Sequence, residues 1–156
     1  MSLQDRIQSD IAVAMRGGDG LRRDVLRMVV SAAYNVEKKQ GKPLTDDEFL
    51  SVLSREVKTR RESVEAFTAG GRPEAAAKEQ AEIAIIRAYL PEQIGADELA
   101  QLVAQAVEES GATSPRDMGK VMAVLMPRVK NRADGKQVSA LVAQELARRD
   151  LAGHGH

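Results

Sequence analysis

The chain of 156 residues contains no cysteine and no tryptophan, and only two phenylalanines, two tyrosines and two histidines. Without cysteine there is no disulfide, no thiolate nucleophile and no cysteine-based zinc site. Apolar residues nevertheless make up 43% of the chain. The core must therefore be built from aliphatic and methionine side chains, a composition that favours packed helices over sheets.

Long apolar runs and an excess of one charge sign are also missing. The first residues, Met1–Arg6, lack the apolar stretch of a signal peptide, and no run approaches the ~18 residues of a transmembrane helix. We therefore expect a soluble, cytoplasmic protein that does not bind membranes. Because 23 basic residues face 23 acidic ones, the chain is not a polycation that would hold nucleic acid through its overall charge.

Familiar catalytic patterns are absent as well. The sequence has neither a Walker loop nor a Gly-x-Ser-x-Gly elbow, and the glycine-rich stretch 17–20 follows a helical pattern rather than a strand. His154 and His156 stand at the C-terminal end, where two imidazoles on a frayed tail do not make a rigid metal site. The sequence predicts no catalytic residue, no metal site and no cofactor.

Nearly every segment that is present has helical periodicity, which predicts an all-α fold. Ser2 and the capping box Thr45–Glu48 begin two of the helices expected before Pro91. Four longer helices are expected there, at about residues 3–16, 21–39, 46–69 and 73–89. In the second of them, the residues expected to face inward are Val25, Met28, Val29, Ala32 and Val36.

Pro91 stops the fourth helix, because proline lacks an N–H and restricts the residue before it. It is the expected hinge between an N-terminal four-helix domain (1–91) and a small three-helix C-terminal domain (92–150), with a frayed tail at 151–156. The three C-terminal helices should have about 13–15 residues each. Ser114 and Asp134 are the expected caps of the second and third of these helices, and Pro127 is expected to end the second.

One C-terminal segment has a local positive excess. Between Arg116 and Lys136 there are six basic residues and two acidic ones, whereas Glu92–Glu109 has five acids and no base. A loop over 128–132 would lead into a helix N-terminus at Asp134, where free N–H groups and the helix dipole favour an anion. The residues expected to contact phosphates are Lys120, Arg128, Lys130, Arg132 and Lys136.

Two glycines belong to the same candidate site. Gly135 would allow a phosphate to approach the helix N-terminus closely. Gly119 has two readings, close packing of helices or close approach of a ligand. The alternative for the whole segment is an ordinary solvated set of lysines and arginines around two helix ends.

A second basic cluster lies in the N-terminal half. It contains Arg22, Arg23, Arg27, Arg55, Lys58, Arg60 and Arg61. Glu56, Glu62 and Glu65 interleave with its later members at helical spacing, which favours a solvated face with ion pairs over a binding site.

Five stretches together resemble the YqeY family, which is related to the C-terminal part of the B subunit of the glutamine-dependent aspartyl/glutamyl-tRNA amidotransferase. The resemblance covers about residues 2–148. It is carried by Val25–Met28, Leu53–Lys58, Tyr89–Gln93, Asp117–Met122 and Arg132–Lys136.

The resemblance implies a helical domain followed by a three-helix tail that contacts tRNA. It also implies a family label of carbon–nitrogen ligase activity with glutamine as amido-N-donor, although the domains that carry the chemistry have no counterpart here. The leading hypothesis is therefore a non-catalytic tRNA-binding or tRNA-delivery module. The alternatives are a protein-interaction adaptor that docks on an amidotransferase or an aminoacyl-tRNA synthetase, and participation in amidation with an added amidase subunit.

Overall fold

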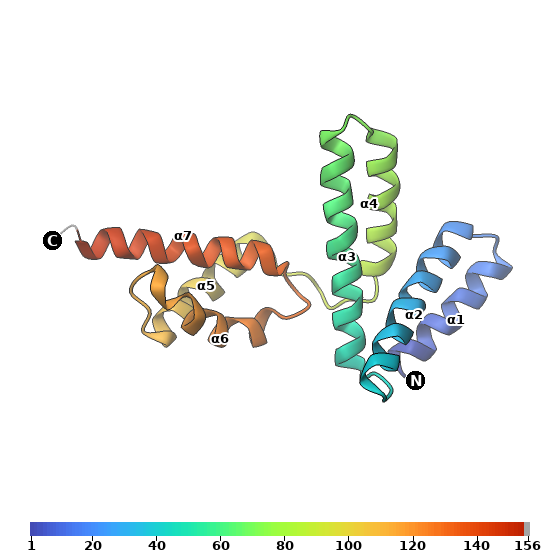
Figure 1. Ribbon diagram of the computed structural model, residues 1–156, viewed down its shortest axis with the longest axis horizontal. Helices are drawn as coiled ribbons and strands as arrows, with labels where there is room; N and C mark the ends of the chain where they lie inside the picture. Colours follow the sequence, from blue (N-terminus) through green and yellow to red (C-terminus); the bar gives the residue numbers. More distant parts are fainter. Residues whose placement is uncertain (155–156) are drawn as a thin grey trace. The chain divides into compact units, whose positions relative to one another are not determined.

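The computed structural model describes residues 1–154, which form seven α-helices and one short 3-10 helix without any β-strand (Figure 1). The predicted all-α class is therefore confirmed. The chain divides into two compact units, Met1–Pro91 and a second that begins at Glu92. Each unit has a hydrophobic core of its own.

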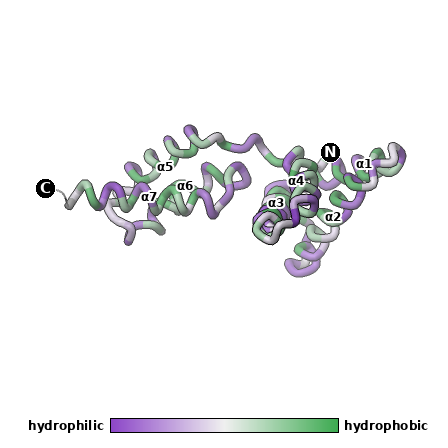
Figure 2. The backbone as a smooth tube through the Cα atoms, turned by 90° about the horizontal axis from the view of Figure 1, so that it is seen from above, coloured by the Kyte–Doolittle hydropathy of each residue, from purple (hydrophilic) through white to green (hydrophobic). Residues whose placement is uncertain are grey.

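The N-terminal unit consists of two pairs of antiparallel helices (Figure 1). The first pair is α1 (Leu3–Arg16) and α2 (Gly20–Gln40), and the second is α3 (Asp46–Ala69) and α4 (Pro73–Arg87). Hydrophobic and hydrophilic residues alternate along these helices (Figure 2), as expected for helices that bury one face.

Local sequence explains where the helices begin. Ser2 and Asp5 form a capping box at α1, and Thr45 and Glu48 form another at α3. In each, the hydroxyl oxygen accepts from the N3 backbone N–H while the N3 carboxylate accepts from the N-cap N–H. Pro73 occupies the first position of α4, where a missing N–H costs nothing.

The buried face of α2 is rotated relative to the expected one. Val25 and Val29 are buried as predicted, but Leu26 and Ala33 complete the face. Met28, expected to point inward, is 53% exposed. The reason is that α2 packs against α1 as well as against α3 and α4, so the buried arc is wider and is centred away from Met28.

A buried arginine joins α3 to α4. Arg60 is only 5% exposed, with Nη1 3.3 Å from Glu56 Oε2 and Nε 3.4 Å from Glu82 Oε2. The assignment of Arg60 to a solvated helix face was therefore wrong. Its spacing from Glu56 indicated the ion pair, but the sequence carries no sign of α4 covering this part of α3. Burial raises the pKa of Glu79, and the nearby Glu82 carboxylate raises it further.

The C-terminal unit contains α5 (Ala96–Ser110), the 3-10 helix η1 (Pro115–Asp117), α6 (Met118–Val129) and α7 (Gly135–His154). Its core is aliphatic, with Leu99, Leu125 and Leu146 fully buried. The segment before α5 belongs to this unit, because the Ile94 N–H donates to the Arg132 carbonyl at 2.8 Å.

Three local expectations for this unit were wrong. Pro127 lies inside α6, which continues to Val129. Val129 is fully buried, and its burial in the core stabilises the last turn of the helix. Arg128 is consequently helical. Ser114 makes no side-chain cap; instead the Asp117 carboxylate accepts from the Thr113 N–H at 2.9 Å.

The third difference concerns α7, which has 20 residues and reaches His154, beyond the expected length of about 13–15. It includes residues 151–154, which were assigned to the frayed tail. Leu151 and Ala152 have high helix propensity, which offsets the low propensity of Gly153, and no proline interrupts the stretch. Residues 155 and 156, including the second histidine, lie outside the described residues.

Substitution Arg60→Ala is expected to destabilise the N-terminal unit by about 3 kcal/mol, because it leaves buried carboxylates without their counter-charge. Both tyrosines, Tyr34 and Tyr89, belong to this unit, and the chain has no tryptophan. Tyrosine fluorescence during denaturant unfolding therefore measures this unit alone.

The matched control is Lys58→Ala, on an exposed position of the same helix, which should change stability by less than about 0.5 kcal/mol. Adding Glu82→Gln to the Arg60→Ala variant should recover part of the loss. Equal effects of Arg60→Ala and Lys58→Ala would contradict a structural role for the buried charge.

Candidate functional site

The structure does not gather the predicted phosphate ligands into one cradle. Lys120 stands near the start of α6, whereas Arg128 stands in its last turn. Eight residues of helix separate them by about 12 Å along the axis. Lys130, Arg132 and Lys136 follow at the Arg128 end, between α6 and the first turn of α7.

Much of the positive excess seen in the sequence is neutralised by the acidic residues of α5. The Arg128 guanidinium forms an ion pair with Glu109, which lowers the pKa of that carboxyl group. Arg132 lies 4.0 Å from Glu98. The acidic and basic stretches that the sequence separates are therefore brought together by the fold.

Lys120 is paired more weakly. Its Nζ lies 3.7 Å from Asp117 Oδ1, and its side chain is 67% exposed. The pKa of Asp117 is lowered, mainly because its carboxylate accepts the Thr113 backbone N–H. An exposed pair of this kind contributes little to stability, so Lys120 can exchange its partner for another anion.

Lys130 and Lys136 are exposed and take no part in these ion pairs. They flank the turn between α6 and α7, in which Asn131 adopts a left-handed conformation with φ 63°. Asparagine tolerates this region better than most residues. The turn thus has one exposed lysine on each side of it.

The segment after Pro91 fastens this turn. The Gln93 Nε2 donates to the Asn131 carbonyl at 3.1 Å, and the Arg132 Nε donates to the Glu92 carbonyl at 3.3 Å. Arg132 is therefore held by α5 and by the segment that precedes it. Its guanidinium serves to anchor the turn, a role that sequence reasoning missed.

The N-terminus of α7 has a cap within the chain. The Lys136 N–H donates to Asp134 Oδ1 at 3.3 Å, and the Val138 N–H donates to the Asp134 carbonyl at 2.9 Å. The predicted role of Asp134 as the cap is confirmed. A phosphate at this helix end would have to compete with the Asp134 carboxylate for the same N–H.

The two candidate glycines stand in open space. A Cβ added at Gly119 or Gly135 would meet no atom within 4 Å, and both residues are exposed. Close packing of helices therefore does not explain Gly119, and that reading was wrong. Their use in binding a ligand stays a prediction.

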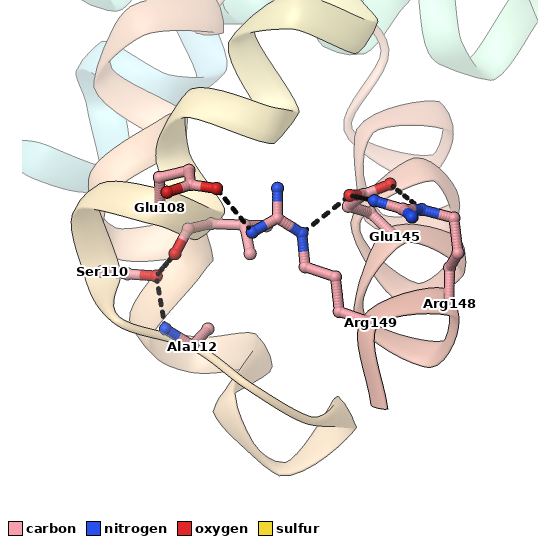
Figure 3. Close-up of polar contacts among 7 residues, drawn as sticks. Glu108, Ser110, Ala112, Glu145, Arg148 and Arg149 are labelled. Carbon is pink, nitrogen blue, oxygen red and sulfur yellow. Dashed lines mark hydrogen bonds and ion pairs between the residues drawn. The ribbon is translucent and has the colours of Figure 1, made fainter. Parts of the chain in front are cut away.

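A second charge network, which sequence reasoning missed, joins α5 to α7. The Arg149 side chain lies between two carboxylates, with Nη1 3.0 Å from Glu108 and Nε 2.7 Å from Glu145 (Figure 3). Arg148 also binds Glu145. The spacing of Glu145, Arg148 and Arg149 could have revealed the part within α7, whereas the contact with Glu108 depends on the packing of α5.

A shallow groove adjoins this network. It is lined by Ala112, Thr113, Arg149, Asp150 and Gly153, and Asp150 also borders a neighbouring hollow formed by residues 114–116. The Arg149 guanidinium is already held by two carboxylates. Within residues 1–154 no group of three or more histidine, aspartate or glutamate side chains could hold a metal ion.

The stability of this unit should depend on pH through Glu145. Hydrogen bonds from Arg148 and Arg149 lower its pKa to about 2. Because the pKa in the folded state lies below that in the unfolded state, the contribution is present above pH ~4.5 and is lost as the pH falls towards 2. Glu145→Gln should cost about 1–2 kcal/mol at pH 7 and much less near pH 2.

Hydrogen exchange followed by mass spectrometry of α7 peptides measures this effect, since the unit lacks tyrosine and tryptophan. The control is Glu108→Gln, because Glu108 is 71% exposed and makes one ion pair. It should cost less than about 0.5 kcal/mol. A Glu145→Gln effect that does not change with pH would contradict the electrostatic explanation.

No helix within residues 1–154 is both long and apolar enough to cross a membrane.

The chain has relatives among known proteins. The chain is 31% identical over 145 residues to "Altered inheritance of mitochondria protein 41, mitochondrial" of Pyrenophora tritici-repentis, covering 89% of this chain and 78% of that protein.

Proteins of the same name match over a shorter range. The one from Eremothecium gossypii is 31% identical over 85 residues, and the one from Saccharomyces cerevisiae strain YJM789 is 29% identical over 85 residues. In both cases the match covers 54% of this chain and 46% of the other protein. The profile of the family described as "Yqey-like protein" matches residues 4–146. The chain therefore belongs to the YqeY-like family.

Proposed function

We propose that this chain is a non-catalytic module that binds tRNA through the C-terminal unit. The observation that carries the proposal is the pair of exposed lysines, Lys130 and Lys136, on either side of the anchored turn between α6 and α7. A rigid turn that presents cations loses little conformational entropy when a phosphate binds.

The neighbouring cations have graded roles in this proposal. Lys120, with its exposed and weakly held pair, makes an outlying contact to the RNA backbone. Arg128 is held by Glu109 and makes a contact only if that pair opens. Arg132 positions the turn rather than the phosphate, because its Nε is used by the Glu92 carbonyl.

The C-terminal unit has almost no net charge, so long-range electrostatic attraction contributes little to RNA binding. Residues 92–154 contain eight basic and nine acidic residues, so the overall field does not attract RNA from a distance. Binding must depend on a few well-placed contacts and on the shape of a folded RNA. The predicted cytoplasmic location is part of the proposal, since tRNA is used there.

The test is a titration of labelled tRNA against the full chain at increasing salt. Because each phosphate contact releases counterions, log Kd should rise linearly with log salt. The double substitution Lys130→Glu and Lys136→Glu should weaken binding about tenfold or more at low salt. It should also reduce the slope of log Kd against log salt concentration by about 1–2, because two phosphate contacts are lost.

The control is Lys58→Glu, on the exposed side of α3. It makes the same Lys→Glu change once, at a position outside the proposed site. It should leave tRNA binding within about twofold of the original. The proposal fails if tRNA does not bind at low salt, or if the double variant binds as well as the Lys58→Glu protein. Circular dichroism should show the same helix content in all variants.

A second candidate function is an adaptor that docks on an amidotransferase subunit or an aminoacyl-tRNA synthetase. The observation that favours it is a set of exposed large apolar side chains on α1 and α2, namely Val13, Met15, Leu21 and Met28. Nuclease treatment of a pull-down distinguishes the two functions. Partners that stay bound support docking, and partners that are lost support binding through RNA.

A third possibility is participation in amidation with an added amidase subunit. It requires that a mixture of the two proteins convert misacylated tRNA into its amidated form.

A further inference from the structure

Tyr34 differs from the other aromatic residues of the chain. Phe49 and Tyr89 are buried, and Phe67 is half-buried beneath the Arg72 guanidinium, which lies 5.2 Å from the ring centre. Tyr34 is 60% exposed in the middle of α2. An exposed aromatic ring on a regular helix makes no contribution to the core that would explain it.

Three cations lie on the face of α2 that carries Tyr34. Among the residues three or four positions from Tyr34, Lys38 is a cation and Glu37 is an acid, whose carboxylate accepts the Leu44 N–H at 3.2 Å. Arg23, Arg27, Tyr34 and Lys38 follow one another at spacings of four, seven and four residues. At 3.6 residues per turn they fall within an arc of about 60°. We call these four residues the α2 stripe. Its length, from residue 23 to 38, is about 22 Å at 1.5 Å per residue.

The charges of the α2 stripe are only partly neutralised. Arg23 pairs with Asp24, Nε to Oδ1, at 2.8 Å. The Arg23 hydrogen bond lowers the pKa of Asp24, and the charges of Arg27 and Lys78 lower it further. One carboxylate is therefore shared among three cations.

Arg27 is oriented by a neutral group. Its Nη2 lies 3.4 Å from the Met15 sulfur on α1, and both residues are exposed. A thioether holds the guanidinium in place without cancelling its charge. The guanidinium thus stays available for an anion on the same face of α2 as Tyr34, about 10 Å from it along the helix axis.

We infer that the α2 stripe binds a single-stranded segment of RNA, with an unpaired base stacked on Tyr34 and flanking phosphates held by Arg27 and Lys38. Stacking on an exposed aromatic ring between cations is the common way in which proteins hold unpaired bases. This inference rests on the proposed function for the identity of the ligand as RNA, but it uses a different unit of the chain.

An acidic protein partner fits the α2 stripe less well. The cores of protein interfaces are depleted of charged residues and contain clustered apolar side chains. The α2 stripe has one ring and three cations, and none of its four residues is an aliphatic side chain. A single aromatic residue between cations suits a base and its phosphates.

The experiment uses the full chain and a fluorescein-labelled oligouridylate of about eight nucleotides, followed by anisotropy at low salt. Tyr34→Ala should weaken binding about tenfold, because stacking contributes ~1–3 kcal/mol per base. Tyr34→Phe should bind within about twofold of the original, since the ring remains. An RNA duplex of matching length, whose bases are not free to stack, should lose no affinity in Tyr34→Ala.

A second readout locates the contact directly. Ultraviolet crosslinking followed by mass spectrometry should place the uridine adduct on the peptide that contains Tyr34. Because Tyr34 is exposed, Tyr34→Ala should keep the helix content measured by circular dichroism. Equal binding of the oligonucleotide by the Ala and Phe variants, or an adduct confined to residues 92–154, would overturn the inference. Binding of an acidic helical peptide in place of the oligonucleotide would overturn it in favour of a protein partner.

The two proposals fail in different ways. The double variant at Lys130 and Lys136 should still bind the short oligonucleotide through α2 while losing tRNA. If that variant keeps tRNA but Tyr34→Ala loses the oligonucleotide, the C-terminal site is refuted and the α2 stripe stands. If the double variant loses tRNA and Tyr34→Ala loses nothing, the α2 stripe is refuted and the C-terminal site stands.

Discussion

Aliphatic side chains from helices before and after Pro91 are buried in two clusters that share no residue. Each helix must cover its apolar side chains with helices of the same unit, because their burial supplies most of the stability of the helix. With one aromatic ring fully buried, that of Phe49, the cores depend on many small contacts between Leu, Ile and Val. This requirement fixes the pairing of α1 with α2, of α3 with α4, and of α5 with α6 and α7.

The two units differ in how their arginine–carboxylate networks are exposed to water. In the N-terminal unit, Arg60 is buried beside Glu56 and Glu82, where a low-dielectric environment makes the loss of one partner costly. In the C-terminal unit, Arg149 connects α5 to α7 through two carboxylates that are more accessible to water. The first arrangement constrains the helix pair, whereas the second is a weaker link that responds to pH and salt.

The same ion pairs bear on binding. The basic segment of the sequence loses two of its arginines to the acids of α5, which leaves Lys130 and Lys136 as the exposed cations at the turn. In α2, by contrast, Arg27 is held by a thioether and keeps its charge available. The proposed contacts with RNA therefore differ in kind: lysines at a rigid turn suit backbone phosphates, and a ring between cations suits an unpaired base.

The sequence by itself determined the helices and most of their beginnings, because hydrophobic periodicity, capping boxes and an N1 proline act within a few residues of one another. It also determined the all-α class and the Asp134 cap. Only the tertiary structure decided that Arg60 is buried, that Val129 draws α6 past Pro127, and that Arg128 and Arg132 meet Glu109 and Glu98. Each of these depends on which helix lies across from the residue in question, and no local pattern specifies that neighbour, because it follows from the packing of whole helix faces.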